Sequence, residues 1–216
     1  MANQETAYGL RPIGLAGSGA NSTGVTQYEI ASDNTNVIYN GEIVVPLAAG
    51  VIDQAGATDG GTTQALGVLT GVMYHDSTTK KPTWLNYWPG SGSVGVDTNY
   101  PVKAFVADNP NQLFQVASDA SLTNRATALA AVFANASLGT SARSGSTDTG
   151  QSSSALGVST IATTATLPLR IVGIVDDDAN NDYAAAGVAM IVRLNAHFNS
   201  GTRRFDSQTT ADSTGI

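Results

Sequence analysis

The sequence predicts a mainly β fold: an antiparallel sandwich or jelly-roll-like domain with an extended N-terminal arm and at most one or two short helices. Short apolar or alternating runs recur along the 216 residues, and Gly, Pro, Asn and Asp separate them at short intervals. This spacing is typical of β-sandwiches and barrels. A chain of this length most simply forms one domain, so we expect a single β domain over residues 25–198.

The chain opens with a segment that has few apolar side chains. Residues 1–24 are rich in Gly, Ser, Ala and Asn, and their apolar anchors are Leu10, Ile13 and Leu15. These anchors are too few to form a core of their own. We therefore expect residues 1–24 to form an extended arm that becomes ordered by lying on a partner.

The first strands of the domain follow this arm. Val25–Ile30 alternates apolar and polar residues, as a half-buried strand does. Ile38-Tyr39, a turn at Asn40-Gly41 that suits type I′, and the run Glu42–Leu47 predict a hairpin. Pro46 then belongs at an edge or strand end. Further apolar runs predict strands at residues 65–74, 83–88, 102–106, 113–116, 156–163, 167–175 and 187–194.

Three segments depart from this series of strands. Leu122–Phe133 is rich in Ala and places apolar residues at near-helical intervals, which predicts one short helix. Residues 139–154 are a low-complexity stretch of Ser, Gly and Thr, for which we expect a loop with nothing to bury. Residues 199–216 are polar, and we expect a loose C-terminal tail.

Composition excludes several classes of function. Cys is absent, which excludes disulfides, thiolate metal sites and cysteine nucleophiles. The net charge is −7 and the basic doublets are Lys80-Lys81 and Arg203-Arg204, so we expect no direct binding of nucleic acid. No apolar run reaches the length of a membrane-spanning helix. Only 12% of residues are charged, below the usual share, which predicts a surface that packs against partners.

Two polar motifs resemble ligand sites but lack parts of them. Gly90–Gly95 has G-x-G-x-x-G spacing, yet Val96–Pro101 cannot begin the helix that a phosphate site needs. Asp176–Asp182 copies the alternate oxygens of a calcium loop but lacks the turn Gly and the bidentate Glu. The sequence favours a hairpin loop for the first motif. For the second it favours a solvated acidic turn, with a weak surface Ca²⁺ site as the alternative.

Neither the histidines nor the aromatic residues complete a recognisable site. His75 and His197 lie at strand ends without a nucleophile elbow in the chain, so we expect no catalytic residue, metal or cofactor. Trp84 and Trp88 share one face of a predicted strand and Tyr87 points to the other. Packing in a core or subunit contact is favoured for these rings, and a sugar-stacking platform is the alternative.

Two blocks of sequence carry a resemblance to a known family. The first block is Met1-Ala-Asn-Gln-Glu-Thr-Ala-Tyr-Gly-Leu-Arg-Pro-Ile13. The second comprises Ala162–Asp176, with its Leu-Pro-Leu-Arg-Ile-Val-Gly-Ile-Val run, and then Ile191–His197. Together they resemble a family of virion structural proteins from tailed bacteriophages.

The resemblance implies a non-enzymatic capsid cement or decoration protein on the exterior of the virion. Such a protein binds the major capsid protein of the assembled head and stabilises the shell. The resemblance also implies a homo-oligomer, most simply a homotrimer on a local threefold axis. Candidate capsid contacts are Leu10, Arg11, Pro12, Ile13 and Leu15, with Arg11 held extended by Pro12 for addition to a neighbour's sheet edge. The alternatives are a tail or head-fibre component and a carbohydrate-binding module displayed on the virion.

Overall fold

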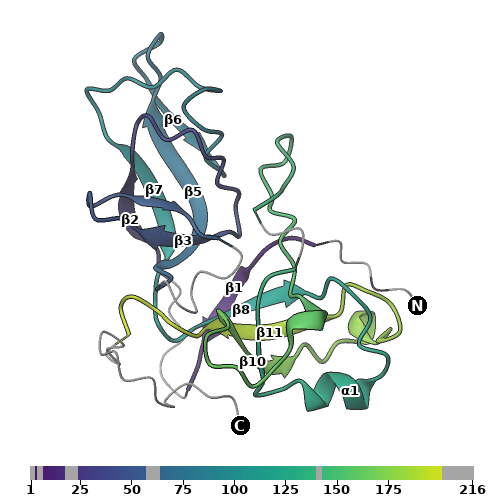
Figure 1. Cartoon of the computed structure of the whole chain (residues 1–216). Coiled ribbons are helices and arrows are strands. Elements are labelled where there is room, and N and C mark those ends of the chain that lie inside the picture. Colours follow the sequence, from purple (N-terminus) through teal and green to yellow (C-terminus); the bar gives the residue numbers. More distant parts are fainter. Residues whose placement is uncertain (1–2, 4–6, 18–23, 57–63, 140–142, 201–216) are drawn as a thin grey trace.

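The computed structural model describes residues 3, 7–17, 24–56, 64–139 and 143–200 (Figure 1). These residues form a mainly β structure with one short α-helix and two single-turn 3₁₀ helices, which confirms the expected fold class. The strands are β1 (Arg11–Leu15), β2 (Thr26–Ile30), β3 (Ile43–Pro46), β4 (Ile52–Gln54), β5 (Gly67–His75), β6 (Pro82–Leu85), β7 (Val102–Ala107), β8 (Gln112–Ala117), β9 (Asn135–Ala136), β10 (Leu169–Ile174) and β11 (Ala189–Leu194). The helices are α1 (Arg125–Ala130), η1 (Val158–Thr160) and η2 (Asp178–Asn180).

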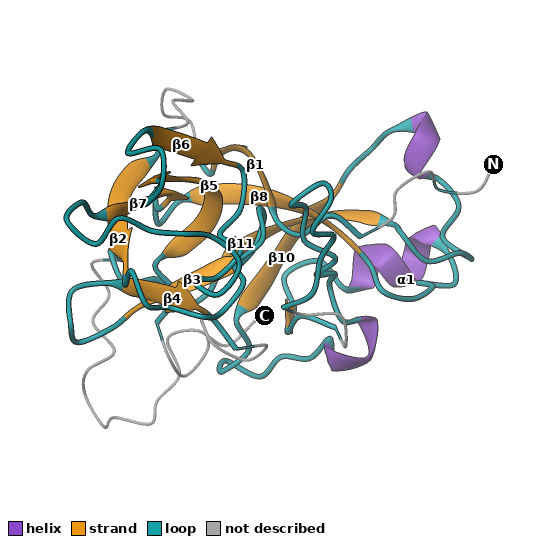
Figure 2. Cartoon of the chain, turned by 90° about the horizontal axis from the view of Figure 1, so that it is seen from above, coloured by secondary structure: helices purple, strands orange, loops and turns teal. Residues whose placement is uncertain are grey.

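Five strands form an antiparallel sheet in the order β1-β8-β11-β10-β9. Figure 2 shows β1, β8, β11 and β10 side by side, with α1 at the end far from β6. Alternate residues of the central strands point to one face. The fully buried side chains of that face are Phe114, Val116, Leu169, Ile171, Met190 and Val192.

The remaining strands form a small barrel. Their order is β3-β4-β2-β7-β5-β6, and a further pairing of β3 with β5 closes the first five of them into a ring. β6 continues beyond the ring by pairing with the second half of β5. Side chains that point into the ring form a core of their own, which includes Ile30, Val44, Ile52, Leu69, Val72, Trp88, Val102, Ala104 and Val106.

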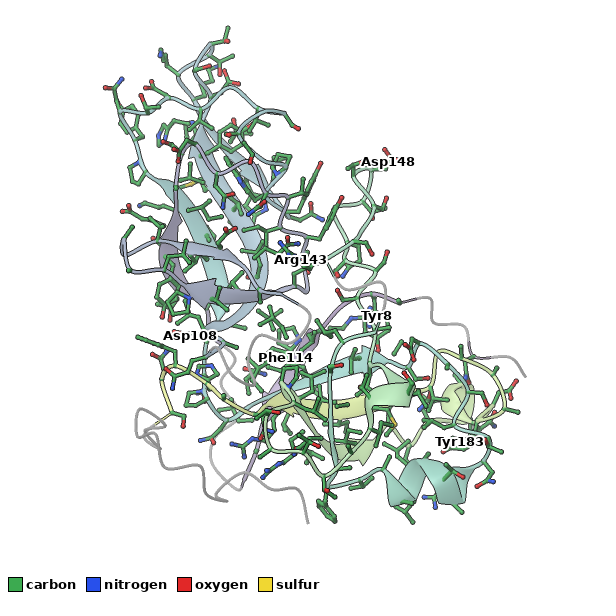
Figure 3. All side chains as sticks on the ribbon, viewed as in Figure 1. Tyr8, Asp108, Phe114, Arg143, Asp148 and Tyr183 are labelled. Atoms are coloured by element: carbon green, nitrogen blue, oxygen red, sulfur yellow. The ribbon has the colours of Figure 1, made fainter. Side chains whose placement is uncertain are left out.

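β3 joins the barrel to the first sheet. Successive side chains of a strand point to opposite faces, and Val44 accordingly lies in the barrel core. Ile43 and Val45 lie in the other core, together with Phe114 of the first sheet (Figure 3). Because this second core draws side chains from both sheets, the two sheets bury apolar surface against each other.

The one α-helix among the described residues is shorter than the expected 122–133. It begins after Asn124, whose side-chain oxygen accepts a hydrogen bond from Thr127 N at 3.0 Å, as a helix N-cap does. Ala128 is its buried residue. The chain then turns away at Phe133, which has a φ of +74° and therefore cannot continue a right-handed helix.

The expectation of an N-terminal arm without a core is wrong for the described part of residues 1–24. β1 pairs with β8 of the same chain, and Leu10 is only 1% exposed. The segment has too few apolar side chains to form a separate core, but it packs against the rest of the domain, whose core includes Leu10. Leu10 is therefore corrected from a candidate capsid contact to a core residue.

The expectation of a loop with nothing to bury is also wrong for residues 143–154. Ser153 N donates to Ser144 O at 2.7 Å and Ser146 N donates to Gln151 O at 3.0 Å, which makes this segment a hairpin with Asp148 near its tip (Figure 3). Its small residues fit against aromatic rings, since a Cβ on Gly145 would lie 2.6 Å from the Tyr39 ring. The predictions for residues 140–142 and for the tail beyond residue 200 lie outside the described residues.

Candidate functional site

β1 is the outermost strand of the first sheet, and the residues before it fix its position. Leu10 N donates to Gly41 O at 2.8 Å, and Gly9 N donates to Ser154 O at 3.0 Å. Gly9 has a φ of +75°, and a Cβ there would lie 2.7 Å from Gly41 O, so no other residue fits without strain. The chain therefore enters β1 between two neighbouring loops, with Tyr8 beside this junction (Figure 3).

Arg11 and Ile13 are the candidate contacts that face solvent. Arg11 is exposed, and its guanidinium carbon lies 4.4 Å from the centre of the Tyr8 ring, a cation–π arrangement. Ile13 is 39% exposed, whereas Pro12 and Leu15 are half-buried. The surface at β1 thus presents a cation held on a buried ring and one branched apolar side chain.

Pro12 blunts the outer edge of β1. Proline has no N–H to donate to a further strand, and in sheets it is confined to edges and bulges. The register with β8 also shifts between Pro12 and Gly14, and such bulges discourage addition of another strand. The expected addition of this segment to a neighbour's sheet is replaced by its addition to β8. A partner at β1 therefore binds side chains.

Trp84 and Trp88 do not form one platform. Trp88 is fully buried, where its Nε1 donates to Asn34 O at 3.1 Å and its ring meets Tyr74 edge-on at 6.2 Å. Trp84 lies on β6 and is 55% exposed. The strand ends at Leu85, so the alternation that placed both rings on one face does not reach Trp88.

Neither histidine lies in a catalytic arrangement. Among the described residues, no hydroxyl or carboxylate hydrogen-bonds to His75, which stacks on Tyr100 at 4.2 Å. His197 is buried; its Nδ1 accepts from Asn199 N at 3.1 Å, and its Nε2 has no partner in the part of the chain that the structure describes. Burial lowers the pKa of His197 from 6.5 to about 4, so this ring is neutral at physiological pH.

The acidic turn uses its side chains to hold itself together. Of the oxygens in the calcium-like spacing, Asn180 Oδ1 accepts from Ala189 N at 2.7 Å, while Asn180 Nδ2 donates to Val175 O at 2.7 Å. Asp177 caps η2 by accepting from Ala179 N at 2.9 Å. Within the described residues, no group of three or more acidic or histidine side chains is placed to hold a metal ion.

The G-x-G-x-x-G segment is a turn. No helix follows Gly95, since residues 97–100 form a further turn, in which Tyr100 N donates to Asp97 O at 3.1 Å. Gly90 has a φ of +81°, and a Cβ there would lie 2.6 Å from Thr35 O. The first Gly of the motif thus permits a close approach of backbone to backbone, and the anion-binding helix N-terminus is absent from this described segment.

Sequence patterns did not predict the buried acid Glu42. Glu42 is only 2% exposed; its carboxylate accepts hydrogen bonds from Gln54 Nε2 at 2.5 Å and from Ser152 Oγ at 3.1 Å. Burial raises the pKa of Glu42, although these hydrogen bonds and the charge of Arg143 oppose the rise. Arg143 is held nearby because its Nε donates to Gln54 Oε1 at 3.0 Å. This network joins the hairpin of residues 143–154 to the barrel.

Comparison with known proteins adds no relative: no family model, no curated protein and no solved structure matches the chain. Among the described residues, no helix is long and apolar enough to cross a membrane.

Proposed function

We propose that this chain is a non-enzymatic cement or decoration protein of a tailed bacteriophage, which binds the major capsid protein on the exterior of the assembled head. The observation that carries the proposal is the structural use of the block that resembles the phage family. Tyr8 and Leu10 are buried, Gly9 fills a position where a Cβ would collide with backbone, and Pro12 ends sheet growth at an edge. The motif is thus a folding determinant, which supports a fold shared with that family.

Features of the surface also support a binding role over catalysis. Within the described residues, neither histidine ring forms a hydrogen bond with a hydroxyl or a carboxylate, although the charge of Asp108 acts on His197. The whole chain has 12% charged residues, and cores of interfaces are depleted in charge. Exposed apolar side chains occur on both sheets, with Ile13 of β1 at 39% and Trp84 of β6 at 55%.

The proposed contact with the shell includes Arg11 and Ile13. Arg11 can form a bidentate bond with a capsid carboxylate, and its position over Tyr8 reduces the conformational freedom that it would lose on binding. A homotrimer would repeat this contact three times around a local threefold axis, so that weak individual contacts add up. The homotrimer is proposed from the resemblance to the phage family. Light scattering of the purified protein tests it by measuring the molar mass of the particle in solution.

The experiment is cosedimentation with heads of the phage that encodes the chain, prepared without this protein. Arg11→Glu is expected to weaken binding by at least about tenfold, equivalent to about 1.4 kcal/mol, because it places like charges together. Its melting temperature should stay near that of the wild type, since Arg11 is exposed. Leu129→Ser on α1 is the matched control, because Leu129 is equally a surface residue, at 54% exposure.

Two outcomes would contradict the proposal at different levels. Unchanged binding by Arg11→Glu and by Ile13→Ser would remove β1 as the contact while leaving the capsid role. Failure of the wild-type protein to bind heads, with cryo-electron microscopy locating it at the tail or on a few fibres, would overturn the capsid role itself.

A further inference from the structure

The outer face of the barrel, opposite the β3 side that packs on the first sheet, carries a row of side chains that begins at the exposed indole of Trp84. In the strand register, Trp84 of β6 lies opposite Met73 of β5, Met73 opposite Lys103 of β7, and Lys103 opposite Glu29 of β2. Residues directly opposite in antiparallel strands share a face. Figure 1 shows these strands side by side in the upper part of the molecule. Trp84 through Glu29 therefore form one row across the sheet.

A glycine beneath Trp84 gives the indole its place on this face. A Cβ on Gly71 would lie 2.4 Å from Trp84 Cζ2 and 2.7 Å from Cη2, so the benzo ring fills the space of a missing side chain. Phe105, opposite Gly71 in the register, supports the indole with ring centres 4.8 Å apart. The inner side of the indole is thus packed, while 55% of the Trp84 residue remains exposed.

Polar side chains that have no partner in the fold lie along this row and beside it. Among the described residues, none hydrogen-bonds or forms an ion pair with the side chains of Gln27, Glu29 or Lys103, and Gln27 lies opposite Phe105 in the register. The neighbouring side chains of β2 behave differently. Thr26 Oγ1 and Tyr28 Oη both donate to Asp108, at 2.8 and 2.6 Å.

From this juxtaposition we infer that Trp84, Phe105, Gln27, Glu29 and Lys103 form a binding site for a neutral oligosaccharide. An exposed indole stacks on the apolar face of a sugar ring, as aromatic faces do on apolar surfaces. Gln27 offers both a donor and an acceptor, Glu29 an acceptor and Lys103 a donor, which together match sugar hydroxyls. The opposite charges of Glu29 and Lys103 cancel, so the site attracts no net charge.

The size of the site favours a glycan over a protein partner. The row crosses three strand spacings of about 4.8 Å, or about 14 Å in all, which suits a short oligosaccharide lying across the strands. A stable protein interface buries about 800 Å² on each partner, whereas one large aromatic residue buries only about 150–250 Å². The site does not depend on the proposed capsid role, because it uses another sheet and another face.

The test uses the isolated full-length protein, a glycan array, and titration with maltohexaose, cellohexaose and chitohexaose. Trp84 is one of two tryptophans in the chain and the other is buried, so stacking should change the emission of an exposed indole. Binding by the wild type should fall at least about tenfold in Trp84→Ala and less in Trp84→Phe. The double variant Gln27→Ala with Lys103→Ala should also bind the glycan more weakly. Gln27 is exposed and Lys103 is half-buried, and Trp84 still covers Gly71 in this variant. Leu129→Ala is the matched control.

Three outcomes would overturn the inference. The first is absence of binding to every glycan on the array at millimolar concentration. The second is binding that persists unchanged in Trp84→Ala. The third is a protein contact: Trp84→Ala abolishes attachment to capsids while the wild type binds no glycan. Capsid binding that fails in the wild type while glycan binding succeeds would refute only the capsid proposal.

Discussion

Ser152 Oγ donates a hydrogen bond to the buried carboxylate of Glu42 at 3.1 Å, across 110 positions of sequence. The bond connects the hairpin of residues 143–154 to the start of β3. Glu42→Ala would leave Ser152 and Gln54 without their acceptor in a buried site. We expect it to reduce the free energy of unfolding by about 2–3 kcal/mol, measured by urea denaturation, and to increase amide exchange in the hairpin first.

The pH dependence of this network has a definite sign. Burial raises the folded-state pKa of Glu42 above the ordinary 4.5, so the folded state binds the proton more tightly than the unfolded state. The contribution to stability is therefore fully present below pH 4.5 and is lost as pH rises through the raised pKa. Relative to Glu42→Gln, the wild type should become less stable as pH rises from 4.5. A constant difference between the two proteins would show that Glu42 does not titrate in this range.

His197 has the opposite effect on stability. Its pKa falls from 6.5 to about 4 on folding, so the unfolded state binds the proton more tightly, and stability is lost as pH falls from 6.5 toward 4. A shift of this size corresponds to about 3 kcal/mol. His197→Gln should flatten this part of the stability curve. Carbon-bound ring proton signals in NMR should report a titration near pH 4, and a midpoint near 6.5 would contradict the buried neutral ring.

Local patterns predicted much of the β structure. The alternation of Val25–Ile30 became β2, and the apolar run around Val102–Val106 became β7, because period-two patterns report burial of one strand face. A turn at Asn40-Gly41 was also anticipated, and Gly41 has a φ of +88°. The type I′ hairpin expected there is wrong, because Asn40 does not have a positive φ and β3 pairs with β4 and β5 instead of with residues 38–39. Such features depend on neighbours within a few positions.

Other features depend on contacts that no local pattern encodes. Closure of the barrel requires Ile43 to pair with Val68, and the burial of Leu10 requires a sheet built from residues a hundred positions later. The serines of the hairpin are of a residue type that is usually exposed to solvent. Ser152 is nevertheless only 1% exposed, and its hydroxyl donates a hydrogen bond to the buried Glu42 carboxylate. At the candidate glycan site, the residue type alone marked Trp84 as a candidate, but the packing of its ring against Gly71 follows only from the three-dimensional structure.

Leu10 provides a direct test of the corrected role of the N-terminal segment. It is 1% exposed and lies in the core that both sheets share. Leu10→Ala should reduce the free energy of unfolding by about 2–5 kcal/mol, the usual range for a buried leucine. Ile13→Ala, three residues along on the surface of β1, should change it by no more than about 0.5 kcal/mol. Equal melting temperatures for both variants would instead support the prediction that the N-terminal segment is an arm outside the core.

Gly9 and Gly17 separate backbone strain from steric collision. Both have positive φ, +75° and +96°, but a Cβ at Gly9 would lie 2.7 Å from Gly41 O, whereas no atom of the described residues lies within 4 Å of one at Gly17. Gly17→Ala should therefore cost only the left-handed strain, about 1–2 kcal/mol. Gly9→Ala should cost clearly more, because the backbone of residue 41 must move and the Leu10 N–H then loses its acceptor. Thermal unfolding of the two variants side by side measures the difference. Equal losses would show that the entry into β1 adapts, and that Gly9 in the phage-like motif is not required by the fold.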